Sequence, residues 1–209
     1  MTNIDSIIFD LDGTLWDSTK LVAKAWNQAI AEDPDLNLTI TAETLKPLFG
    51  QLMPDIAKSL FPDCSREHQL QLIDRCCQIE HEILLKTCAP LYDRLEETLE
   101  ALSSSYPLYI VSNCQTGYIE VFLQTSGLDH HFDDHLCPGD TGNPKAENIK
   151  EIIRKHHLKA PVYVGDTEGD YKAAKAAEVP FVFASYGFGS VDTPDYTIQN
   201  LYELTKEFL

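Results

Sequence analysis

The chain has 209 residues, and its content of 44% hydrophobic and 23% charged residues is ordinary for a globular protein with a sizeable core. The 33 Asp and Glu residues against 16 Lys and Arg give a formal net charge of −17. A negative field of this size argues against a nucleic acid polymer or an anionic membrane as a partner, and a phosphate site would need positive charge from a metal ion or a placed lysine.

The N-terminal segment and the cysteines together predict a cytoplasmic protein. The first residues show no basic region of a signal peptide, and no apolar run approaches the length of about 18 residues that a membrane span needs. The cysteines form no C-x-x-C pattern, so we expect reduced thiols that pack as small apolar side chains. They stand at positions 64, 76, 77, 88, 114 and 137.

In chain order, an apolar run over residues 6–11 predicts a short buried strand. No strand-like run follows until residue 90, and apolar residues at helical spacing instead predict a block of helices, with Trp16 and Trp26 packed in the core. The helices are expected over 21–32, 42–49, 54–61 and 66–86.

From Pro90 onward, predicted helices and strands alternate, which favours an α/β fold with a parallel sheet covered on both faces. The expected helices cover 95–102, 117–127, 148–157 and 170–178, and the expected strands cover 107–113, 135–139, 161–166 and 180–187. The chain is therefore predicted as a discontinuous core of residues 1–14 and 90–209, with a helical insert over 15–89. Ligands of such sheets bind at the carboxyl ends of the strands.

The segment FDLDGTLWDS, residues 9–18, ends the first strand on two acids, Asp10 and Asp12. Carboxylates this close repel unless a cation or a shared proton lies between them. One could attack a phosphate ester as a nucleophile while the other carries protons to and from the reacting oxygens. Alternatively, Asp-x-Asp-Gly is only a turn, formed at Gly13, whose acids accept backbone hydrogen bonds.

A second acidic segment, GDTEGD, places Asp166 at the end of a predicted strand and Asp170 at the start of the next helix. If this strand neighbours the first, its acids converge with Asp10 and Asp12 on one point. Mg²⁺ prefers such oxygen ligands, and its charge would relieve the repulsion between them. Asp170 is alternatively a helix N-cap, and both roles are compatible.

Two further segments could bind a phosphoryl group. Ser112 and Asn113 end the predicted strand PLYIVSN, where a hydroxyl and backbone N–H groups can hold a phosphoryl oxygen. Lys145 precedes a helix, where its ammonium could offset negative charge. Taken singly, the first pair is an ordinary polar strand end and Lys145 an ordinary surface lysine.

Together these segments resemble the haloacid dehalogenase-like hydrolases, in particular the phosphoglycolate phosphatase-like group with a small helical cap. FDLDGTLWDS, IVSN, PKAENI and VGDTEGD resemble the four motifs of that family in order, over essentially the whole chain. The resemblance implies a Rossmann-like parallel-sheet core, and the insert over 15–89 stands where the cap of that family does.

For the acids, the resemblance implies that Asp10 is the nucleophile and a Mg²⁺ ligand. Asp12 would be the general acid and base, and its backbone carbonyl would bind the metal. Asp166 would be a further ligand, and Asp170 would support the metal or its waters.

For the phosphoryl group, the resemblance implies that Ser112 and Lys145 bind it. The third motif departs from a frequent pattern of the family, in which a lysine directly precedes a proline, because here Asn143 precedes Pro144 and Lys145 follows it. Dehalogenases of the superfamily lack the second acid, so Asp12 argues against carbon–halogen chemistry.

A helical cap over the site would exclude water and select the leaving group. The loop between cap helices suggests Lys46, Gly50 and Gln51 as specificity residues, although a surface charge is the preferred interpretation of Lys46. The pairs His130-His131 and His156-His157 stand at polar helix ends, and we expect them at the surface without a metal.

The sequence therefore predicts a Mg²⁺-dependent phosphatase for a small phosphorylated metabolite, such as phosphoglycolate, a sugar phosphate or a nucleotide, acting through an aspartyl-phosphate. Two alternatives remain at this point. A phosphomutase of the β-phosphoglucomutase type would use the same fold. A non-catalytic sensor of phosphate ligands would need neither a nucleophile nor a proton carrier.

Overall fold

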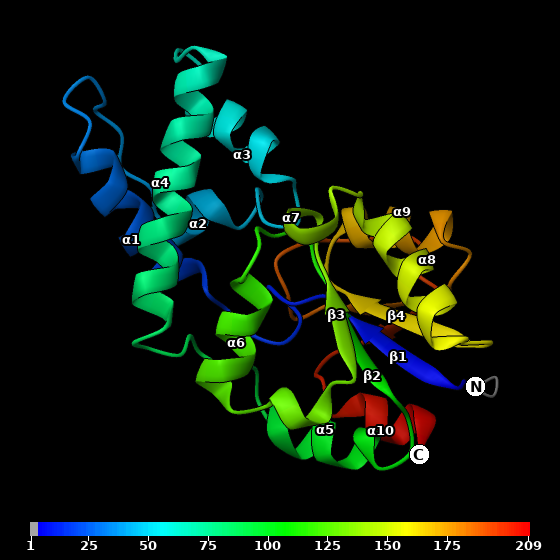
Figure 1. Cartoon of the computed structure of the whole chain (residues 1–209). Helices are drawn as coiled ribbons and strands as arrows, with labels where there is room; N and C mark the ends of the chain where they lie inside the picture. The colour runs from blue at the N-terminus through cyan, green and yellow to red at the C-terminus, as the bar shows by residue number, and fades with distance from the viewer. Residues whose placement is uncertain (1–3) are drawn as a thin grey trace.

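A six-stranded sheet in which every neighbouring pair is parallel forms the centre of the computed structural model, which describes residues 4–209 (Figure 1). The strand order is β3-β2-β1-β4-β5-β6, so that β2 and β3 extend the sheet on one side of β1, and β4, β5 and β6 extend it on the other. The strands are β1 (Ser6–Phe9), β2 (Leu108–Val111), β3 (Asp134–Leu136), β4 (Pro161–Gly165), β5 (Phe181–Ala184) and β6 (Tyr196–Ile198).

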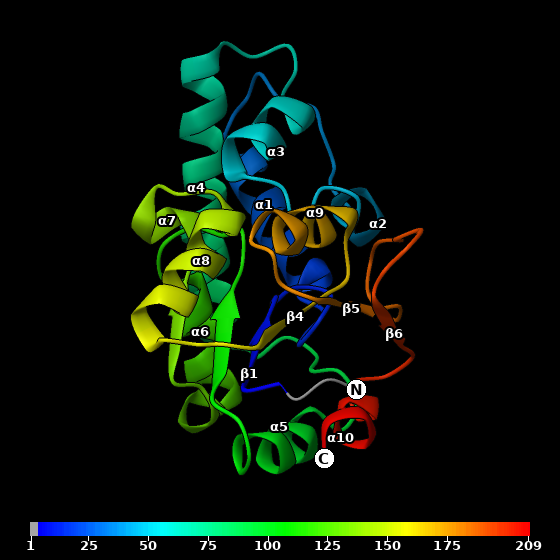
Figure 2. The same cartoon turned by 90° about the vertical axis from the view of Figure 1, so that its right-hand side faces the viewer.

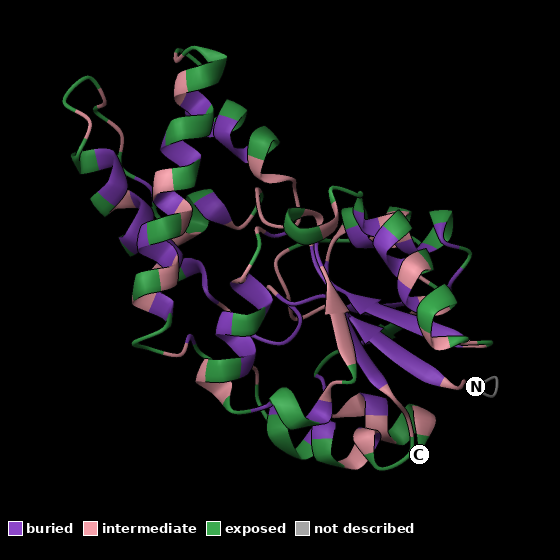
Figure 3. Cartoon of the chain, viewed as in Figure 1, coloured by how far each residue is buried: buried purple, intermediate pink, exposed green. Residues whose placement is uncertain are grey.

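Successive residues of each central strand face opposite sides of the sheet, and both sides are covered by helices (Figure 2). Ile7 and Phe9 of β1 pack toward α5, α6 and α10, whereas Ile8 packs toward α8 and α9. These helices are α5 (Leu95–Ser103), α6 (Tyr118–Ser126), α8 (Lys145–His156), α9 (Glu168–Ala176) and α10 (Glu203–Phe208). The central strands are therefore buried on both faces (Figure 3).

Five helices follow β1 before the chain returns to the sheet, and the first four share a separate hydrophobic cluster that includes Trp26. These four are α1 (Thr19–Ala31), α2 (Ala42–Leu45), α3 (Met53–Leu60) and α4 (Arg66–Leu84). We call residues 15–89 the helical segment. None of the helices within residues 4–209 is both long and apolar enough to cross a bilayer.

The α/β fold and its parallel sheet are confirmed, and the differences lie in short elements. The helix expected over 42–49 ends at Leu45, because the chain then turns and Gly50 takes a positive φ of 84°. The expected strand near 135–139 is shortened to β3, and Pro138 begins the short helix α7 (Pro138–Thr141). Strand β6 and helix α10 were not predicted. Strand β6 has only three residues, which is too short for an alternating apolar pattern to be detected.

The cysteine prediction agrees with the structure, in which all six side chains are free thiols. The predicted surface position of His131 is wrong. This residue ends the 3₁₀ helix η1 (Asp129–His131) and is only 5% exposed.

Helix α8 offers a test of this packing, because it carries Lys145 and is anchored to the sheet by Ile149, which is fully buried. We expect Ile149→Ala to lower the free energy of unfolding by about 2–5 kcal/mol, through lost transfer energy and the cavity left behind. The neighbouring Lys150→Ala, an exposed position, should change it by less than about 0.5 kcal/mol. Urea unfolding measures both, and an equal loss in the two variants would contradict this packing.

Candidate active site

The carboxyl ends of β1 and β4 bring three buried acids together. Asp10 follows β1, and its backbone N–H donates to the carbonyl of Val164 in the adjacent β4 at 2.8 Å. Asp166 follows β4, and Asp170 lies in the first turn of α9. One carboxylate oxygen of each of Asp10, Asp166 and Asp170 lies within 4.8 Å of the others, and all three side chains are at least 98% buried.

The ammonium of Lys145 lies inside this acid cluster. It is 4% exposed and donates to Asp10 Oδ1 at 2.8 Å and to Asp170 Oδ1 at 2.5 Å. Burial by itself lowers the pKa of Lys145, but the two carboxylates more than offset this effect, so the pKa lies above its ordinary value. The alternative of a solvated surface lysine is therefore wrong, and Lys145 is a fixed cation in the site.

Asp170 is held by contacts on both of its oxygens. Oδ1 accepts from Lys145, and Oδ2 accepts from the backbone N–H of Thr167 at 3.0 Å and from its hydroxyl at 2.6 Å. The Thr167 hydroxyl in turn accepts from the Asp170 N–H, which completes a capping box at the start of α9. Asp170 therefore caps a helix and orients Lys145 at the same time.

Asp166 differs in having an oxygen without a partner. Its Oδ2 accepts from the Phe188 N–H at 2.6 Å, whereas its Oδ1 is buried and makes no hydrogen bond. Burial and the neighbouring Asp170 and Asp10 raise the pKa of Asp166 well above its ordinary value. A buried acceptor without a donor is costly, and it fits a position that a bound cation would complete.

The charge balance of the cluster supports the same conclusion. Burial, followed by repulsion from Asp170, raises the pKa of Asp10 to about 6, although Lys145 and Ser112 oppose the shift. Three acids face one ammonium here, and all their ligand atoms are oxygens. Such a donor set fits a hard divalent cation such as Mg²⁺.

Asp12 lies in the turn after β1 and has different partners. Its Oδ1 accepts from the Ser18 hydroxyl at 2.6 Å and from the Tyr118 hydroxyl at 3.0 Å. Burial is the largest cause that raises the pKa of Asp12 to about 7, and the nearby Asp10 adds to it. A carboxyl with this pKa can both donate and accept a proton near neutral pH.

Ser112 and Asn113 follow β2, on the other side of β1. Ser112 is 4% exposed, and its side-chain hydrogen bond helps to lower the pKa of Asp10. The Asn113 amide instead donates to the carbonyl of Gly50 at 2.7 Å, which joins this loop to the helical segment. Of the two, Ser112 has its side chain directed to the acid cluster.

Residues 7–184 match the family model of the haloacid dehalogenase-like hydrolases. The chain belongs to this family. It is 28% identical to a phosphoglycolate phosphatase of Vibrio parahaemolyticus over 225 aligned residues, covering 98% of this chain and 96% of that one. It is 26% identical to a phosphoglycolate phosphatase of Aquifex aeolicus, with 96% and 94% covered.

Solved structures agree with this membership. A haloacid dehalogenase-like hydrolase of Streptococcus pneumoniae superposes with a TM-score of 0.84 at 26% identity, with all of both chains covered. CbbY of Rhodobacter sphaeroides, in complex with xylulose 1,5-bisphosphate, shares the fold with a TM-score of 0.80 at 16% identity, with 96% of both chains covered. The resemblance deduced from the four motifs is thus confirmed, and the chain is a hydrolase of this family.

The loop residues singled out from the sequence lie at the edge of this hydrolase site. Lys46 and Gln51 line an open cavity of about 320 Å³, bounded on the other side by Thr167 and Phe188, and Gly50 also borders it. The Lys46 ammonium pairs with Glu43 at 2.8 Å, and its side chain is 34% exposed. Neither Lys46 nor Gln51 contacts the acid cluster by a described hydrogen bond.

Sequence reasoning missed Glu80 and Gln115. Glu80, on α4, is 2% exposed and accepts from Gln115 Nε2 at 2.6 Å, across the boundary between the helical segment and the sheet. It also accepts from Trp26 Nε1 at 2.6 Å, so that Trp26 does more than fill the core. A charged residue within a predicted amphipathic helix looks like a solvated one, and only the fold shows that Glu80 faces inward.

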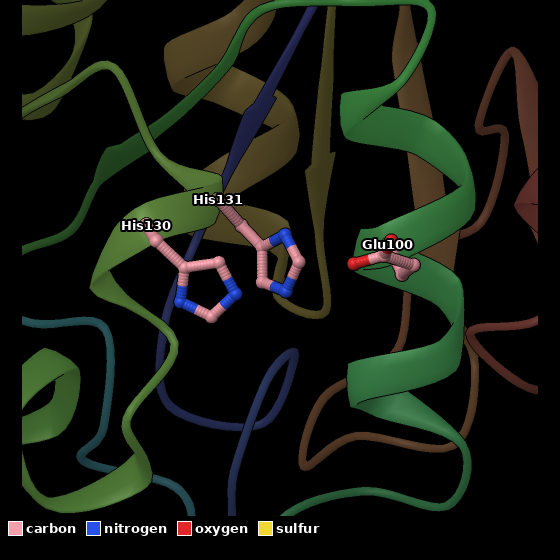
Figure 4. Close-up of side chains that lie close together, drawn as sticks. All are labelled: Glu100, His130 and His131. Carbon is pink, nitrogen blue, oxygen red and sulfur yellow. The ribbon is translucent and has the colours of Figure 1, made fainter.

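A second group of potential metal ligands lies away from this site. Figure 4 shows His130 and His131 of η1 opposite Glu100 of α5, and one ligand atom of each lies within 4.8 Å of the others. The His131 Nδ1 lies 3.1 Å from the Ser103 hydroxyl. These residues precede β3 in the chain, so they lie toward the amino end of the sheet, away from Asp10.

Gly13 provides a test of how tightly Asp166 is enclosed. It has a φ of +82°, and a Cβ added there would collide with the Asp166 carboxylate. We expect Gly13→Ala to cost about 3 kcal/mol of unfolding free energy, from backbone strain plus overpacking. Gly142→Ala is the matched control, because Gly142 has a φ of +72° but no atom within 4 Å of an added Cβ. It should cost only about 1–2 kcal/mol in the same unfolding assay, and equal costs would contradict the close approach.

Lys145→Met tests the buried ion pairs. Without the ammonium, the pKa of Asp10 rises above the value of about 6 that it has in the wild type. The variant therefore loses stability relative to the wild type as the pH rises above about 6, where Asp10 is ionised in the wild type. At pH 8 in EDTA we expect a loss of about 3–5 kcal/mol, which should shrink at pH 5 because Asp10 becomes protonated. Urea unfolding at the two pH values measures this. The surface variant Lys150→Met should match the wild type at both, and a pH-independent loss in Lys145→Met would refute the pairing.

Proposed function

We propose that this hydrolase is a Mg²⁺-dependent phosphatase of small phosphomonoesters that works through an aspartyl-phosphate on Asp10. The observation that carries the proposal is the buried Lys145 ammonium between Asp10 and Asp170, beside the unpartnered oxygen of Asp166. The curated relatives named as phosphoglycolate phosphatases support the same reaction class.

In the first step, a carboxylate oxygen of Asp10 attacks the phosphorus atom. The bond from phosphorus to Asp10 forms as the bond to the ester oxygen breaks, and Asp12 gives its proton to the departing alkoxide. Lys145 and Ser112 bind the phosphoryl oxygens, where the negative charge of the transition state accumulates.

In the second step, Asp12 is a carboxylate and takes a proton from water. The water oxygen attacks the phosphorus atom, which releases phosphate and restores Asp10 and the protonated Asp12. A pKa of about 7 suits Asp12 to both steps.

The carboxylates of Asp10 and Asp166 and the backbone carbonyl of Asp12 would hold the metal ion. When bound, Mg²⁺ supplies positive charge that offsets repulsion between these acids and the phosphoryl group. Asp170 remains close by, and its contacts favour the positioning of Lys145 as its main role.

We further propose that residues 15–89 act as a cap over a core of residues 1–14 and 90–209. The helical segment has its own hydrophobic cluster, and its contacts with the core include the hydrogen bonds from Asn113 to Gly50 and from Gln115 to Glu80 and the aromatic contact of Phe49 with Phe188. A cap with a hydrophobic cluster of its own can open to admit substrate and close to exclude water. The expected location is the cytoplasm, where free thiols persist.

Phosphate release from p-nitrophenyl phosphate tests the proposal. Activity should require Mg²⁺, stop with EDTA, and fall by about 10³-fold or more in Asp10→Asn, which lacks the nucleophile. Asp35→Asn, an exposed position in the helical segment, should retain wild-type activity.

Three outcomes would contradict the proposal. Asp10→Asn with wild-type activity would refute the nucleophile. Isomerisation of a sugar phosphate primed by its bisphosphate, without net phosphate release, would favour the phosphomutase. Tight binding of phosphate esters without turnover would favour the sensor.

A further inference from the structure

A small cavity lies beside Asp12, between the helical segment and the core. It encloses about 20 Å³ and is lined by residues from both sides, including Trp26 and Met53 of the helical segment and Tyr118 of the core. This is room for about one water molecule. If Asp12 protonates the departing alkoxide, as the proposed function holds, then this cavity adjoins the position of the leaving group.

The cavity is lined by carboxyl groups and lacks a basic side chain among the described residues. Of the described residues that line it, Asp12 and Glu80 carry carboxyl groups and none is a lysine or an arginine. His81 lies next to Gln115, and burial lowers its pKa, so it supplies no positive charge at neutral pH. The phosphate end of the site has a fixed cation in Lys145, whereas the leaving-group end has none.

Most of the side-chain N–H and phenol donors of the lining already have acceptors. Trp26 Nε1 and Gln115 Nε2 both donate to Glu80. The Tyr118 hydroxyl donates to Asp12 Oδ1. The Asn113 amide N–H donates to the Gly50 carbonyl. A ligand in this cavity therefore meets few free donors.

Acceptors, in contrast, remain free. Asn113 Oδ1 is buried and has no partner, and its identity as the oxygen follows from the donation by the amide nitrogen. Each Glu80 oxygen accepts one hydrogen bond and has a second lone pair. The cavity thus offers hydrogen-bond acceptors, and no cation, to whatever enters it.

We propose that this subsite, resting on the phosphatase assignment, selects esters whose small alcohol brings a hydroxyl or ammonium donor to Glu80 and Asn113, and disfavours an alcohol with a carboxylate. A carboxylate there would lose its hydration without meeting a cation, which is costly where water is excluded, and at a pH above the raised pKa of Glu80, about 8, it would also face a like charge. A donor instead satisfies the acceptors left open in the cavity. Phosphoglycolate releases glycolate, an alcohol that carries a carboxylate, and is therefore a poor substrate of this chain.

Four esters of similar size test the inference: 2-hydroxyethyl phosphate, phosphoethanolamine, ethyl phosphate and 2-phosphoglycolate. For the wild type with Mg²⁺ at pH 9, where Glu80 is ionised, we expect kcat/KM for the better donor ester to exceed that for phosphoglycolate by about tenfold or more, with ethyl phosphate between them. The first two esters distinguish a hydroxyl ligand from an ammonium ligand.

At pH 9, where Glu80 is ionised because its pKa is about 8, Glu80→Gln should bring the ratio of donor ester to phosphoglycolate to within about threefold, because it removes the charge and keeps the shape of the side chain. Glu82→Gln, at an exposed position on the same helix, should leave the ratio unchanged. A variant that only loosens the cap would lower all four values together, so the ratio reports on selectivity rather than on folding.

The outcomes separate this inference from the proposed function. Phosphoglycolate as the best ester of the wild type, or an unchanged ratio in Glu80→Gln, would overturn the inference alone. Turnover of p-nitrophenyl phosphate but of none of the four esters would do the same. Failure to release phosphate from any of the five compounds would overturn both.

Discussion

The buried ammonium of Lys145 is the interaction on which the rest of the site depends. It lies 2.8 Å from Asp10 and 2.5 Å from Asp170, in a space from which water is excluded. Without it, the acids at the ends of β1 and β4 would have no counter-charge among the protein groups around them. Helices α8 and α9 cover the same face of the sheet, so they bring the lysine and its second carboxylate to Asp10 together.

Close backbone packing makes this arrangement rigid. A Cβ added at Gly13 or at Gly187 would collide with Asp166, which is therefore enclosed by loops that follow two different strands. The Phe188 N–H fixes one oxygen of Asp166 and leaves the other buried without a hydrogen-bond partner. The orientation of the Asp166 carboxylate thus depends on the two glycines that leave room for it as well as on its hydrogen bond to Phe188.

Two parts of the candidate site differ in electrostatics, and in the proposed reaction this difference would govern substrate choice. Lys145 provides a cation beside Asp10, whereas Glu80 and Asn113 make the cavity beside Asp12 rich in acceptors. Burial, the largest cause, raises the pKa of Glu80 to about 8, although Gln115 and Trp26 oppose the shift. The helical segment therefore contributes a buried carboxyl group to the cavity beside Asp12.

The order of the main strands and helices from β1 to β5 and the acids at the ends of β1 and β4 were determined by the sequence alone, because apolar periodicity and strand-end polarity are local patterns. The family followed for the same reason, since its four motifs are short and contiguous. Only the tertiary structure decided that Lys145 is buried, that Asp170 holds it, and that Glu80 faces the cavity beside Asp12. Each of these depends on a partner from a distant segment, such as Gln115, which lies 35 residues from Glu80. A contact of that kind leaves no periodic trace in the chain, because it depends on how the elements pack rather than on the residues next to it.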